Sequence, residues 1–556
     1  MTLGERTRAQ SAAAARDDSG RIPLRVRIGV TGHRDPLPAP DLSAAVCDRL
    51  VEVRALFSAS RTTAVAFEML SALADGADRV VVREAVDFFE SAGVDVDLHA
   101  VLPLEVDNYR EDFASAASLA QFDELLQAAA LRTTMPRVAD REQAYELAGR
   151  FIADHSDVMI ALWDGREQAE IGGTAEIVRY ARRMGTPVLV VPTARASDPD
   201  RTPDPPAWRS GTQRLGPATT ALRRLNEYNR RPASDRSFRS RLEDERMRLE
   251  EGSRRSWAVP REYHPAATWA LPHFVRADVL AVKYQRAYYR SALGLYCLAA
   301  LAVVAVTAQT QFNWPIAVAF VEIAAMVGVL GIYGRAQACR LHERWLGYRS
   351  LAEAFRSALF ITMTGVHERP AAGPPPTLNT ATELWHQRAF SEAWRRRPEA
   401  TVDRSNGREL GQFLAVTWIG HQIRYHRDVA AKARAKRRAL SAAILILFVV
   451  TIVVAALHAG GFWVDSSWTA RLVFLAVALP SSGAALAGIR DHHQYRSHEI
   501  RSTAVADRLE GLRREMETHG DLRRVRKLAG EANAVIGREN LDWLGVIELQ
   551  DLELVV

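Results

Sequence analysis

The sequence has few cysteines and no apolar stretch near its first residue. Cys47, Cys297 and Cys339 are the only cysteines among 556 residues, and their wide spacing fits neither a metal-binding pattern nor a disulfide framework. Residues 1–21 are rich in Ala, Arg and Asp, so we expect a disordered tail there rather than a signal peptide. These absences favour a reducing cellular interior, and we expect no metal cofactor.

Charge is nearly absent from four apolar runs. The runs occupy residues 291–308, 315–333, 439–457 and 472–489. A helix of about 18 residues, rising about 1.5 Å per residue, just crosses a hydrocarbon core about 30 Å thick. Basic residues cluster outside both pairs of runs, among them Arg290, Arg335, Arg438 and Arg490. The pattern predicts two membrane hairpins whose ends all face the cytoplasm. A buried helical hairpin in a soluble core is the alternative interpretation.

Positive charge exceeds negative charge only slightly, with 72 Lys and Arg against 66 Asp and Glu. A basic balance could indicate nucleic-acid binding. However, much of the excess flanks the apolar runs, where membrane orientation explains it. We therefore expect a multi-pass protein of the cell membrane, with both termini cytoplasmic, with the lipid bilayer as a partner and with no direct nucleic-acid binding.

Strand-like and helical patterns alternate between residues 22 and 195. Five short apolar runs predict strands, at 26–30, 64–70, 94–103, 157–165 and 188–192. Helical patterns separate them, which predicts an α/β fold with a Rossmann-like, mostly parallel sheet. In such sheets ligands bind beyond the carboxyl ends of the strands, where the strand order reverses.

Three of the predicted strands end in loops that contain glycine and polar residues. Glycines let the backbone approach a phosphate, and helix N-termini offer free N–H groups to it. An arginine such as Arg34 can clamp a phosphate with two hydrogen bonds. Each loop alone is weak evidence, but three at one sheet edge predict a ligand site. Its candidate residues are Thr31, Gly32, His33, Arg34, Asp75, Gly76, Asp78, Gly172, Gly173, Thr174 and Glu176.

Several of these residues could instead stabilise the fold without contacting a ligand. A histidine beside a turn, such as His33, is more often a hydrogen-bonded loop residue than a catalyst. Asp75 and Asp78 could bind ribose hydroxyls or could belong to the cap and first turn of the next helix. Trp163 could stack on a base, although a core position is the expected one.

Three segments of this region, IGVTGHR, LADGADRVVVREA and GGTAEIVRYARRMGTPVLVVP, resemble the Rossmann-like domain shared by the DprA and Lonely-guy proteins, the SLOG superfamily. The resemblance covers residues 22–195 and implies a nucleotide-derived ligand. Lonely-guy members hydrolyse an N-glycosidic bond with the glutamate of a PGGxGTxxE signature. Here Glu176 follows Thr174 by two residues rather than three, a rotation of about 100° on a helix, so the resemblance implies binding rather than catalysis. If the domain is an enzyme, Glu176 is its candidate catalytic residue.

The two predicted hairpins look like copies of one module. Ser291-Ala292 aligns with Ser441-Ala442, a Gly-Ile pair ends each hairpin (331–332 and 488–489), and a His-Glu pair follows each (342–343 and 498–499). We expect an α-helical membrane region with four transmembrane helices in two hairpins. The predicted organisation is a tail (1–21), the SLOG-like domain (22–195), a linker with charged helices (196–262), the first module (263–362), a linker (363–410) and the second module (411–556).

Residues around the hairpins resemble the SLATT module, a two-helix membrane effector attached to SLOG and other nucleotide sensors in prokaryotic conflict systems. The resemblance rests on Tyr348–Arg356, on Trp418–Gln422 with Tyr425, and on Glu539–Leu544. It implies an effector that permeabilises the membrane in antiviral defence when its SLOG domain binds a ligand. Because four helices with one acidic residue line at most a narrow conduit, we expect a homo-oligomer. A membrane-anchored nucleotide N-glycosidase is the alternative. Solute transport is a third interpretation, which the few polar residues in the spans disfavour.

One acidic residue, Glu322, lies near the middle of the second apolar run. The equivalent position of the second hairpin is Ala478 or Leu479, so the acid breaks the symmetry of the duplication. A charged carboxylate at that depth costs about 2.5–3.5 kcal/mol. We therefore expect Glu322 to face a helix interface or a polar lumen and to act in the pore.

Overall fold

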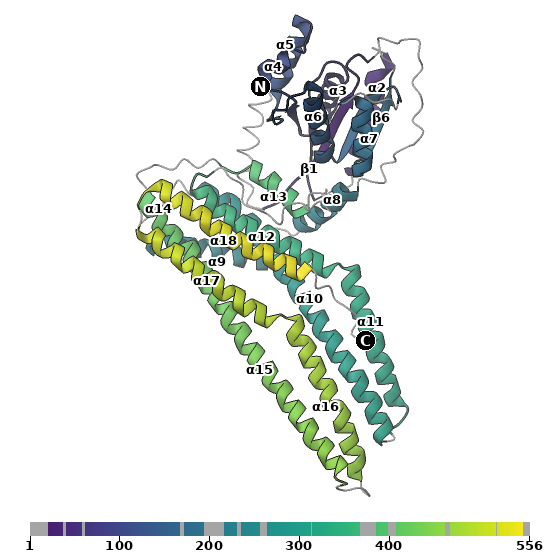
Figure 1. Cartoon of the computed structure of the whole chain (residues 1–556), viewed down its shortest axis with the longest axis vertical. Coiled ribbons are helices and arrows are strands. Elements are labelled where there is room, and N and C mark those ends of the chain that lie inside the picture. The colour runs from purple at the N-terminus through teal and green to yellow at the C-terminus, as the bar shows by residue number, and fades with distance from the viewer. Residues whose placement is uncertain are drawn as a thin grey trace. The chain divides into compact units, whose positions relative to one another are not determined.

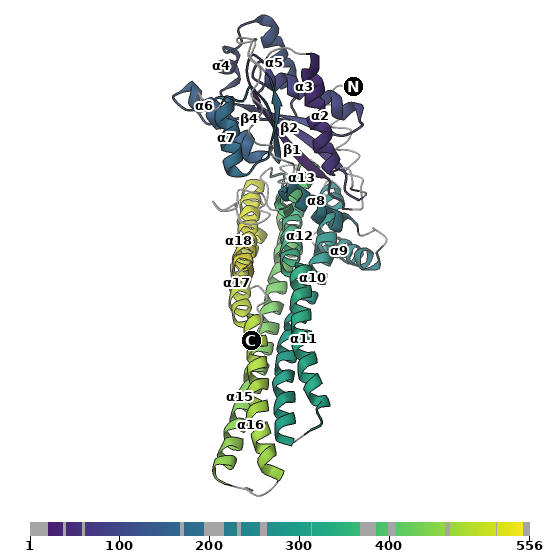
Figure 2. The same ribbon diagram turned by 90° about the vertical axis from the view of Figure 1, so that its right-hand side faces the viewer.

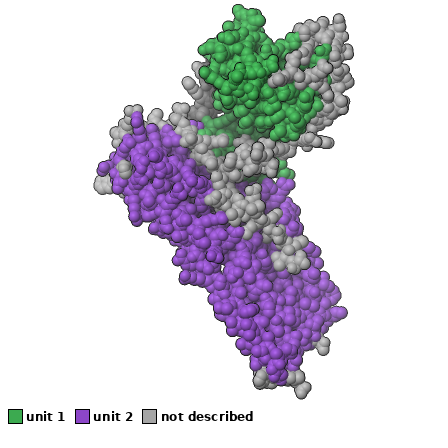
Figure 3. Space-filling view, in the orientation of Figure 1, with its two compact units in different colours: residues 1–232, 375–396 green, residues 233–374, 397–556 purple. Residues whose placement is uncertain are grey.

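The chain forms two compact units (Figure 3). Unit 1 comprises residues 1–232 and 375–396, and unit 2 comprises residues 233–374 and 397–556. The chain therefore leaves unit 1, returns to it for one helix, and then enters unit 2 again. The computed structural model describes residues 20–36, 40–57, 60, 62–166, 172–193, 216–230, 235–255, 264–312, 314–366, 385–398, 407–461, 467–518 and 520–548.

Unit 1 is built around a six-stranded sheet in which every pairing is parallel. The strand order is β4-β3-β2-β1-β5-β6, so the order reverses between β1 and β5. This arrangement confirms the predicted α/β fold with a Rossmann-like sheet. The strands are β1 (Leu24–Gly32), β2 (Val65–Ser71), β3 (Val96–Leu102), β4 (Leu131–Thr134), β5 (Val158–Trp163) and β6 (Val188–Pro192).

The strand β4 is absent from the sequence-based prediction. Its four residues, LRTT, are exposed or half-exposed at the edge of the sheet. Such a segment lacks the apolar run by which buried parallel strands are recognised.

Helices cover both faces of the sheet. The helix α2 (Pro40–Phe57) packs against α3 (Ala77–Ser91), and α6 (Arg141–His155) packs against α7 (Thr174–Met184) on the other face (Figure 2). The helix α7 buries one stripe, which includes Ile177, Val178 and Ala181, against a core that also contains residues of α6 and β5. Two shorter helices, α4 (Val106–Arg110) and α5 (Ala116–Ala128), precede β4.

Two further helices of unit 1 lie at the edge formed by the N-terminal ends of the strands (Figure 1). The helix α8 (Gly216–Asn229) ends in Asn229, whose side chain pairs with both backbone groups of Ile22, at 3.0 and 2.7 Å. The helix α13 (Trp385–Arg395) lies within the segment expected to be a linker between the hairpin modules. It buries most of its residues and packs against α8 and β1.

Unit 2 is helical. Its elements are α9 (Arg236–Arg255), α10 (His264–Phe312), α11 (Ala317–Ala338), α12 (Leu341–Met363), α14 (Gly407–Phe413), the π-helical turn η4 (Leu414–Ile419), α15 (Gly420–Ala459), α16 (Ser467–His492), α17 (Tyr495–Thr518) and α18 (Leu522–Glu548). The helices α8 and α9 correspond to the two charged helices expected in this part of the chain, and the break expected around residues 231–232 lies outside the described residues.

Four helices of the described chain are long and apolar enough to cross a membrane. Three of the predicted spans lie within α10, α15 and α16, and α11 begins at Ala317, two residues after the start of the predicted span 315–333, which confirms the expected helical membrane region. The helices pair as two hairpins, α10 with α11 and α15 with α16, and α10 also packs against α16 (Figures 1 and 2). Large apolar side chains such as Phe320, Val327 and Phe448 are more than 60% exposed, as expected for a surface in contact with lipid.

The two hairpin modules share an unusual backbone feature. Arg340 (φ 45°) lies between α11 and α12, and Gln494 (φ 46°) lies between α16 and α17. A positive φ is uncommon in residues other than glycine. In each copy the third helix then packs along the first, α12 on α10 and α17 on α15. The common break and packing support the duplication inferred from the sequence.

Candidate ligand-binding site

The C-terminal ends of β1 and β5 meet the start of α3 at Gly32. Gly32 pairs with Leu162 of β5. A Cβ atom on Gly32 would lie 2.3 Å from Cβ of Ala77 and 2.8 Å from the carbonyl oxygen of Leu162. Real side chains do not approach so closely, so this position requires glycine. The first predicted loop therefore lies at the reversal of strand order, where Rossmann-like folds bind ligands.

His33 and Asp164 lie in contact across this switch point. The backbone N–H of Asp164 donates a hydrogen bond to Nε2 of His33 (3.1 Å), and Oδ1 of Asp164 lies 3.1 Å from the same nitrogen. The two residues are 6% and 2% exposed. His33 is thus a hydrogen-bonded residue that joins β1 to β5. Asp164 is not among the sequence candidates, although the Asp-Gly pair that follows β5 is a signal that could have identified it.

The second predicted loop packs against the first. Gly76 has a φ of 81°, and a Cβ atom there would lie 2.2 Å from the carbonyl oxygen of Arg34. The N–H of Ala77, in the first turn of α3, donates to the carbonyl oxygen of His33 (3.0 Å). Since Gly76 is the N-cap of α3 and has no side chain, the helix begins directly beside Thr31–Arg34.

The carboxylates of the second loop have partners within the loop and its neighbours. Asp78 accepts a hydrogen bond from Oγ of Ser71 (3.0 Å), and burial raises its pKa to about 6. Asp75 accepts from Oγ of Ser118 (2.5 Å) and pairs with Arg79 (2.6 Å). Asp78 lies in the first turn of α3, whereas Asp75 is not its N-cap. The geometry assigns both residues a role in holding the loop.

The backbone of this loop is strained at Leu73. Leu73 has a φ of 58°, its N–H donates to Oγ of Ser71 (3.0 Å), and its carbonyl oxygen accepts from Nε of Arg79 (3.0 Å). Non-glycine residues held in this region are found mainly where the surrounding structure fixes them, often at functional sites.

Arg34 presents an exposed guanidinium beside the switch point. Its guanidinium carbon lies 4.8 Å from the centre of the Tyr145 ring, on α6, and the Tyr145 hydroxyl hydrogen-bonds to Asp112. A cation above an aromatic face is attracted by the ring and stays accessible to an anion. Tyr145 and Asp112 are positioning residues that the sequence patterns do not indicate.

The third predicted loop meets α6 next to the same tyrosine. Gly172 has a φ of 73°, and a Cβ atom there would lie 3.1 Å from Cβ of Tyr145. The N–H of Gly172 donates to Glu176 (2.8 Å), whose other carboxylate oxygen lies 3.5 Å from Arg150. One oxygen of Glu176 therefore holds the turn before α7, and the other faces α6. Gly173 is the N-cap of α7, and Thr174 is its first residue.

The three predicted loops are therefore connected. Gly76 contacts the backbone of Arg34, and Tyr145 lies against both Arg34 and the Gly172 turn. Trp163, in contrast, is 4% exposed within the core beneath α7, which confirms the core position expected for it.

Glu322 lies on α11, far from these loops in sequence. It is half-buried, while Phe320 and Ile323 beside it are 67% and 54% exposed. Ala325, one turn later and about 60° around the helix, is 3% exposed. Glu322 thus lies between the outer face of α11 and the face that the bundle buries.

These features define a multi-pass membrane protein with a Rossmann-like domain that precedes two helical hairpin modules. The second module, over residues 417–543, matches the family described as SMODS and SLOG-associating 2TM effector domain 1 (SLATT_1). Residues 276–367, in the first module, match a family described as Protein of unknown function (DUF4231). No curated protein matches the chain. The SLATT resemblance is confirmed for the second module, and a SLOG domain followed by SLATT modules is consistent with the N-terminal parallel sheet.

Proposed function

We propose that this protein is a ligand-gated membrane effector of prokaryotic antiviral defence. A nucleotide-derived ligand binds unit 1 at the switch point, and binding changes the packing of unit 2 so that the membrane becomes permeable. The observation that carries this proposal is the SLATT effector match on a module that follows a Rossmann-like domain in the same chain.

The chemistry of the switch point supports a phosphate-bearing ligand. Two helices, α3 and α7, begin at glycines in this region, and helix N-termini attract anions. Arg34 adds an exposed guanidinium that can donate two parallel hydrogen bonds. An N-glycosidase is not favoured, because one carboxylate oxygen of Glu176 accepts from the N–H of Gly172 and the other lies 3.5 Å from Arg150 of α6.

Connectivity supports coupling between the two units. The helix α13 lies in sequence between the two hairpin modules, and its buried ion pairs hold it on the sheet of unit 1. Each hairpin module is therefore directly connected, through the polypeptide chain, to a segment of the ligand-binding unit. To move unit 2 from about 1% to about 99% open, the ligand must bind the open state about 10⁴-fold more tightly than the closed state.

The proposed orientation rests on the basic residues that flank the hairpins, and the proposed oligomer rests on the small number of membrane helices in one chain. Basic residues flank both hairpins, which supports a cytoplasmic position for the hairpin ends and for both termini. Four helices with one acidic residue line at most a narrow conduit, so the permeable state is a homo-oligomer.

Binding and turnover experiments on the purified full chain test the ligand-sensing step. NAD, ADP-ribose and nucleoside monophosphates are added in turn, with calorimetry for binding and chromatography for products. We expect binding without turnover by at least one of them. Arg34→Gln weakens that binding, whereas Arg83→Gln, in an exposed pair with Glu124, does not. Turnover that Glu176→Ala abolishes would contradict the sensor and establish the enzyme.

A further inference from the structure

Unit 2 contains a cavity of about 320 Å³ near the ends of the membrane spans. Its wall combines basic and aromatic side chains from α10, α12, α15, α17 and the residues before α17. They include Tyr289, Arg349, Lys432, Lys436, His493 and Tyr495. The cavity is separate from the switch-point site, because every lining residue belongs to unit 2.

Two lysines give this cavity an uncompensated positive charge. Lys432 and Lys436 lie one turn apart on α15, and neither has an acidic partner among the residues that the structure describes. Their neighbours Arg434 and Arg437 both pair with Glu499, at 2.7 and 3.1 Å. Glu499 thus pairs with two neighbouring arginines of this helix and with neither of the lysines that line the cavity.

The remaining charges of the cavity do not cancel the lysines. Arg349 pairs with Glu353 at 2.6 Å, so that pair is close to neutral. Among the lining residues that the structure describes, Glu539 is the one carboxylate. Its charge interacts with that of Arg349, and the two lysines leave the net charge of the described lining positive.

A stack of aromatic rings forms one wall. Tyr289 stacks on His493 with ring centres 4.3 Å apart, and His493 stacks on Tyr495 at 5.1 Å. The Nζ atom of Lys436 lies 6.0 Å from the centre of the Tyr495 ring. The stack joins α10 to the start of α17 and keeps Lys436 beside the cavity.

One end of the cavity lies close to the ends of three membrane spans. Tyr289 precedes the apolar run 291–308, Lys436 precedes the run 439–457, and His493 follows the run 472–489, each by about one helical turn or less. Lysine and tyrosine side chains at the ends of spans reach the polar headgroup layer.

We propose that this cavity binds a phosphate-bearing anion, with Lys432 and Lys436 as its charge partners and the Tyr289–His493–Tyr495 stack as its wall. The phosphate belongs either to a lipid headgroup of the adjacent leaflet or to a small molecule in solution. Both sources present the same anionic oxygens, and their difference is whether acyl chains are attached.

Binding to the full chain in a zwitterionic detergent tests this site. The probes are dioctanoyl phosphatidic acid, dioctanoyl phosphatidylcholine and inorganic phosphate, each titrated separately. An anionic surface attracts each lysine by about 1 kcal/mol, which corresponds to about fivefold in affinity. We therefore expect Lys436→Gln to weaken phosphatidic acid binding about fivefold and Lys432→Gln/Lys436→Gln about 25-fold. Lys436→Arg retains the affinity and shows that the loss does not come from misfolding.

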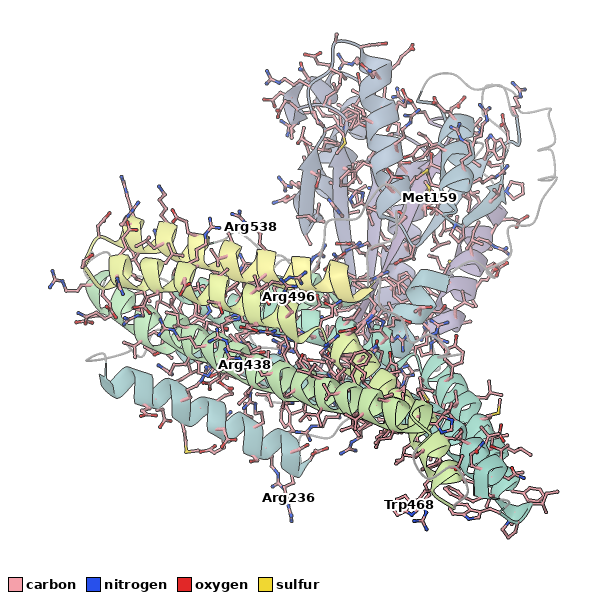
Figure 4. The ribbon with its side chains drawn as sticks, turned by 60° about the horizontal axis from the view of Figure 1, so that its bottom comes forward. Met159, Arg236, Arg438, Trp468, Arg496 and Arg538 are labelled. Carbon is pink, nitrogen blue, oxygen red and sulfur yellow. The ribbon has the colours of Figure 1, made fainter. Side chains whose placement is uncertain are left out.

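Arg438→Gln is the matched control. Arg438 lies on the same helix (Figure 4), also lacks an acidic partner in the described part of the chain, and does not line the cavity. Binding of phosphatidic acid alone identifies a lipid site, and equal binding of inorganic phosphate identifies a site for a soluble phosphate. Three results would overturn the proposal. The first is that neither anion binds, and the second is that phosphatidylcholine binds as strongly as phosphatidic acid. The third is that Arg438→Gln and Lys436→Gln lose equal affinity for phosphatidic acid.

Discussion

The guanidinium of Arg25 binds the carboxylate of Glu392, 367 residues further along the chain, with two hydrogen bonds of 2.8 and 3.1 Å. Arg25 lies at the start of β1, and Glu392 lies on α13. Burial alone would raise the pKa of Glu392, but the charge and hydrogen bonds of Arg25 outweigh burial and lower it. Arg388 and Arg395 of the same helix pair with Asp157 and Glu68. The helix is thus held on the sheet by ion pairs rather than by apolar packing alone.

Glu392→Gln is expected to release α13 from the sheet. The substitution leaves Arg25 with Asp97 as its remaining acidic partner, at 2.6 Å. Removing one partner of a buried pair costs about 3–5 kcal/mol. Hydrogen exchange of residues 385–395 in the full chain should therefore accelerate. Glu124→Gln, which breaks an exposed pair, should change stability by less than about 1 kcal/mol. Unchanged exchange in Glu392→Gln would mean that the pair does not hold the helix.

Gly76→Ala is expected to disrupt the switch-point site, and Gly93→Ala provides a control at another glycine with a positive φ. Both glycines have a positive φ, but an added Cβ meets nothing within 4 Å at Gly93 and a backbone carbonyl at 2.2 Å at Gly76. Gly93→Ala should cost about 1–2 kcal/mol. Gly76→Ala should cost about 2–5 kcal/mol, because overpacking adds to the backbone strain. Chemical unfolding measures both, and equal losses would mean that Arg34 moves away freely.

Asp78 predicts a pH dependence of stability. Burial raises its pKa from 3.8 to about 6, so the folded state holds this proton more tightly than the unfolded state. The contribution of Asp78 is therefore greatest below about pH 4 and is lost as the pH rises to about 6, by up to roughly 3 kcal/mol. Asp78→Asn removes this dependence. Unfolding of both proteins at pH 4.5 and pH 7 isolates the effect, and identical pH profiles would show that Asp78 titrates normally.

Glu322→Gln is expected to alter ion conduction without unfolding the bundle. The amide keeps the size of the side chain and removes a charge that costs about 2.5–3.5 kcal/mol inside a bilayer. Conductance and cation selectivity of the reconstituted chain should therefore change. Thr451→Val is the control, because the Thr451 hydroxyl donates to the carbonyl oxygen of Leu447 in its own helix. Unchanged conductance and selectivity in Glu322→Gln would reduce Glu322 to a structural residue.

The sequence predicts the parts of this structure that depend on local patterns. Apolar runs identify five of the six strands and all four membrane helices, since burial and length determine them directly. The partners of the site residues come from distant segments, as with Asp164 beside His33 and Tyr145 beside Arg34. The packing of α13 on the sheet is equally non-local. Its charged side chains are typical of a solvent-exposed helix, and their partners Arg25 and Asp157 come from distant parts of the sequence. No local pattern specifies which of two opposite charges meet across 367 residues.

Ion leakage from liposomes that contain the full chain tests the ligand-gated effector most directly. Leakage is measured with and without each of NAD, ADP-ribose and the nucleoside monophosphates, for the natural chain and for Arg34→Gln. We expect low leakage without a nucleotide and a large increase with the nucleotide that binds unit 1. In Arg34→Gln the response should shift to a higher nucleotide concentration. Leakage that is the same with and without every nucleotide that binds unit 1 would contradict it.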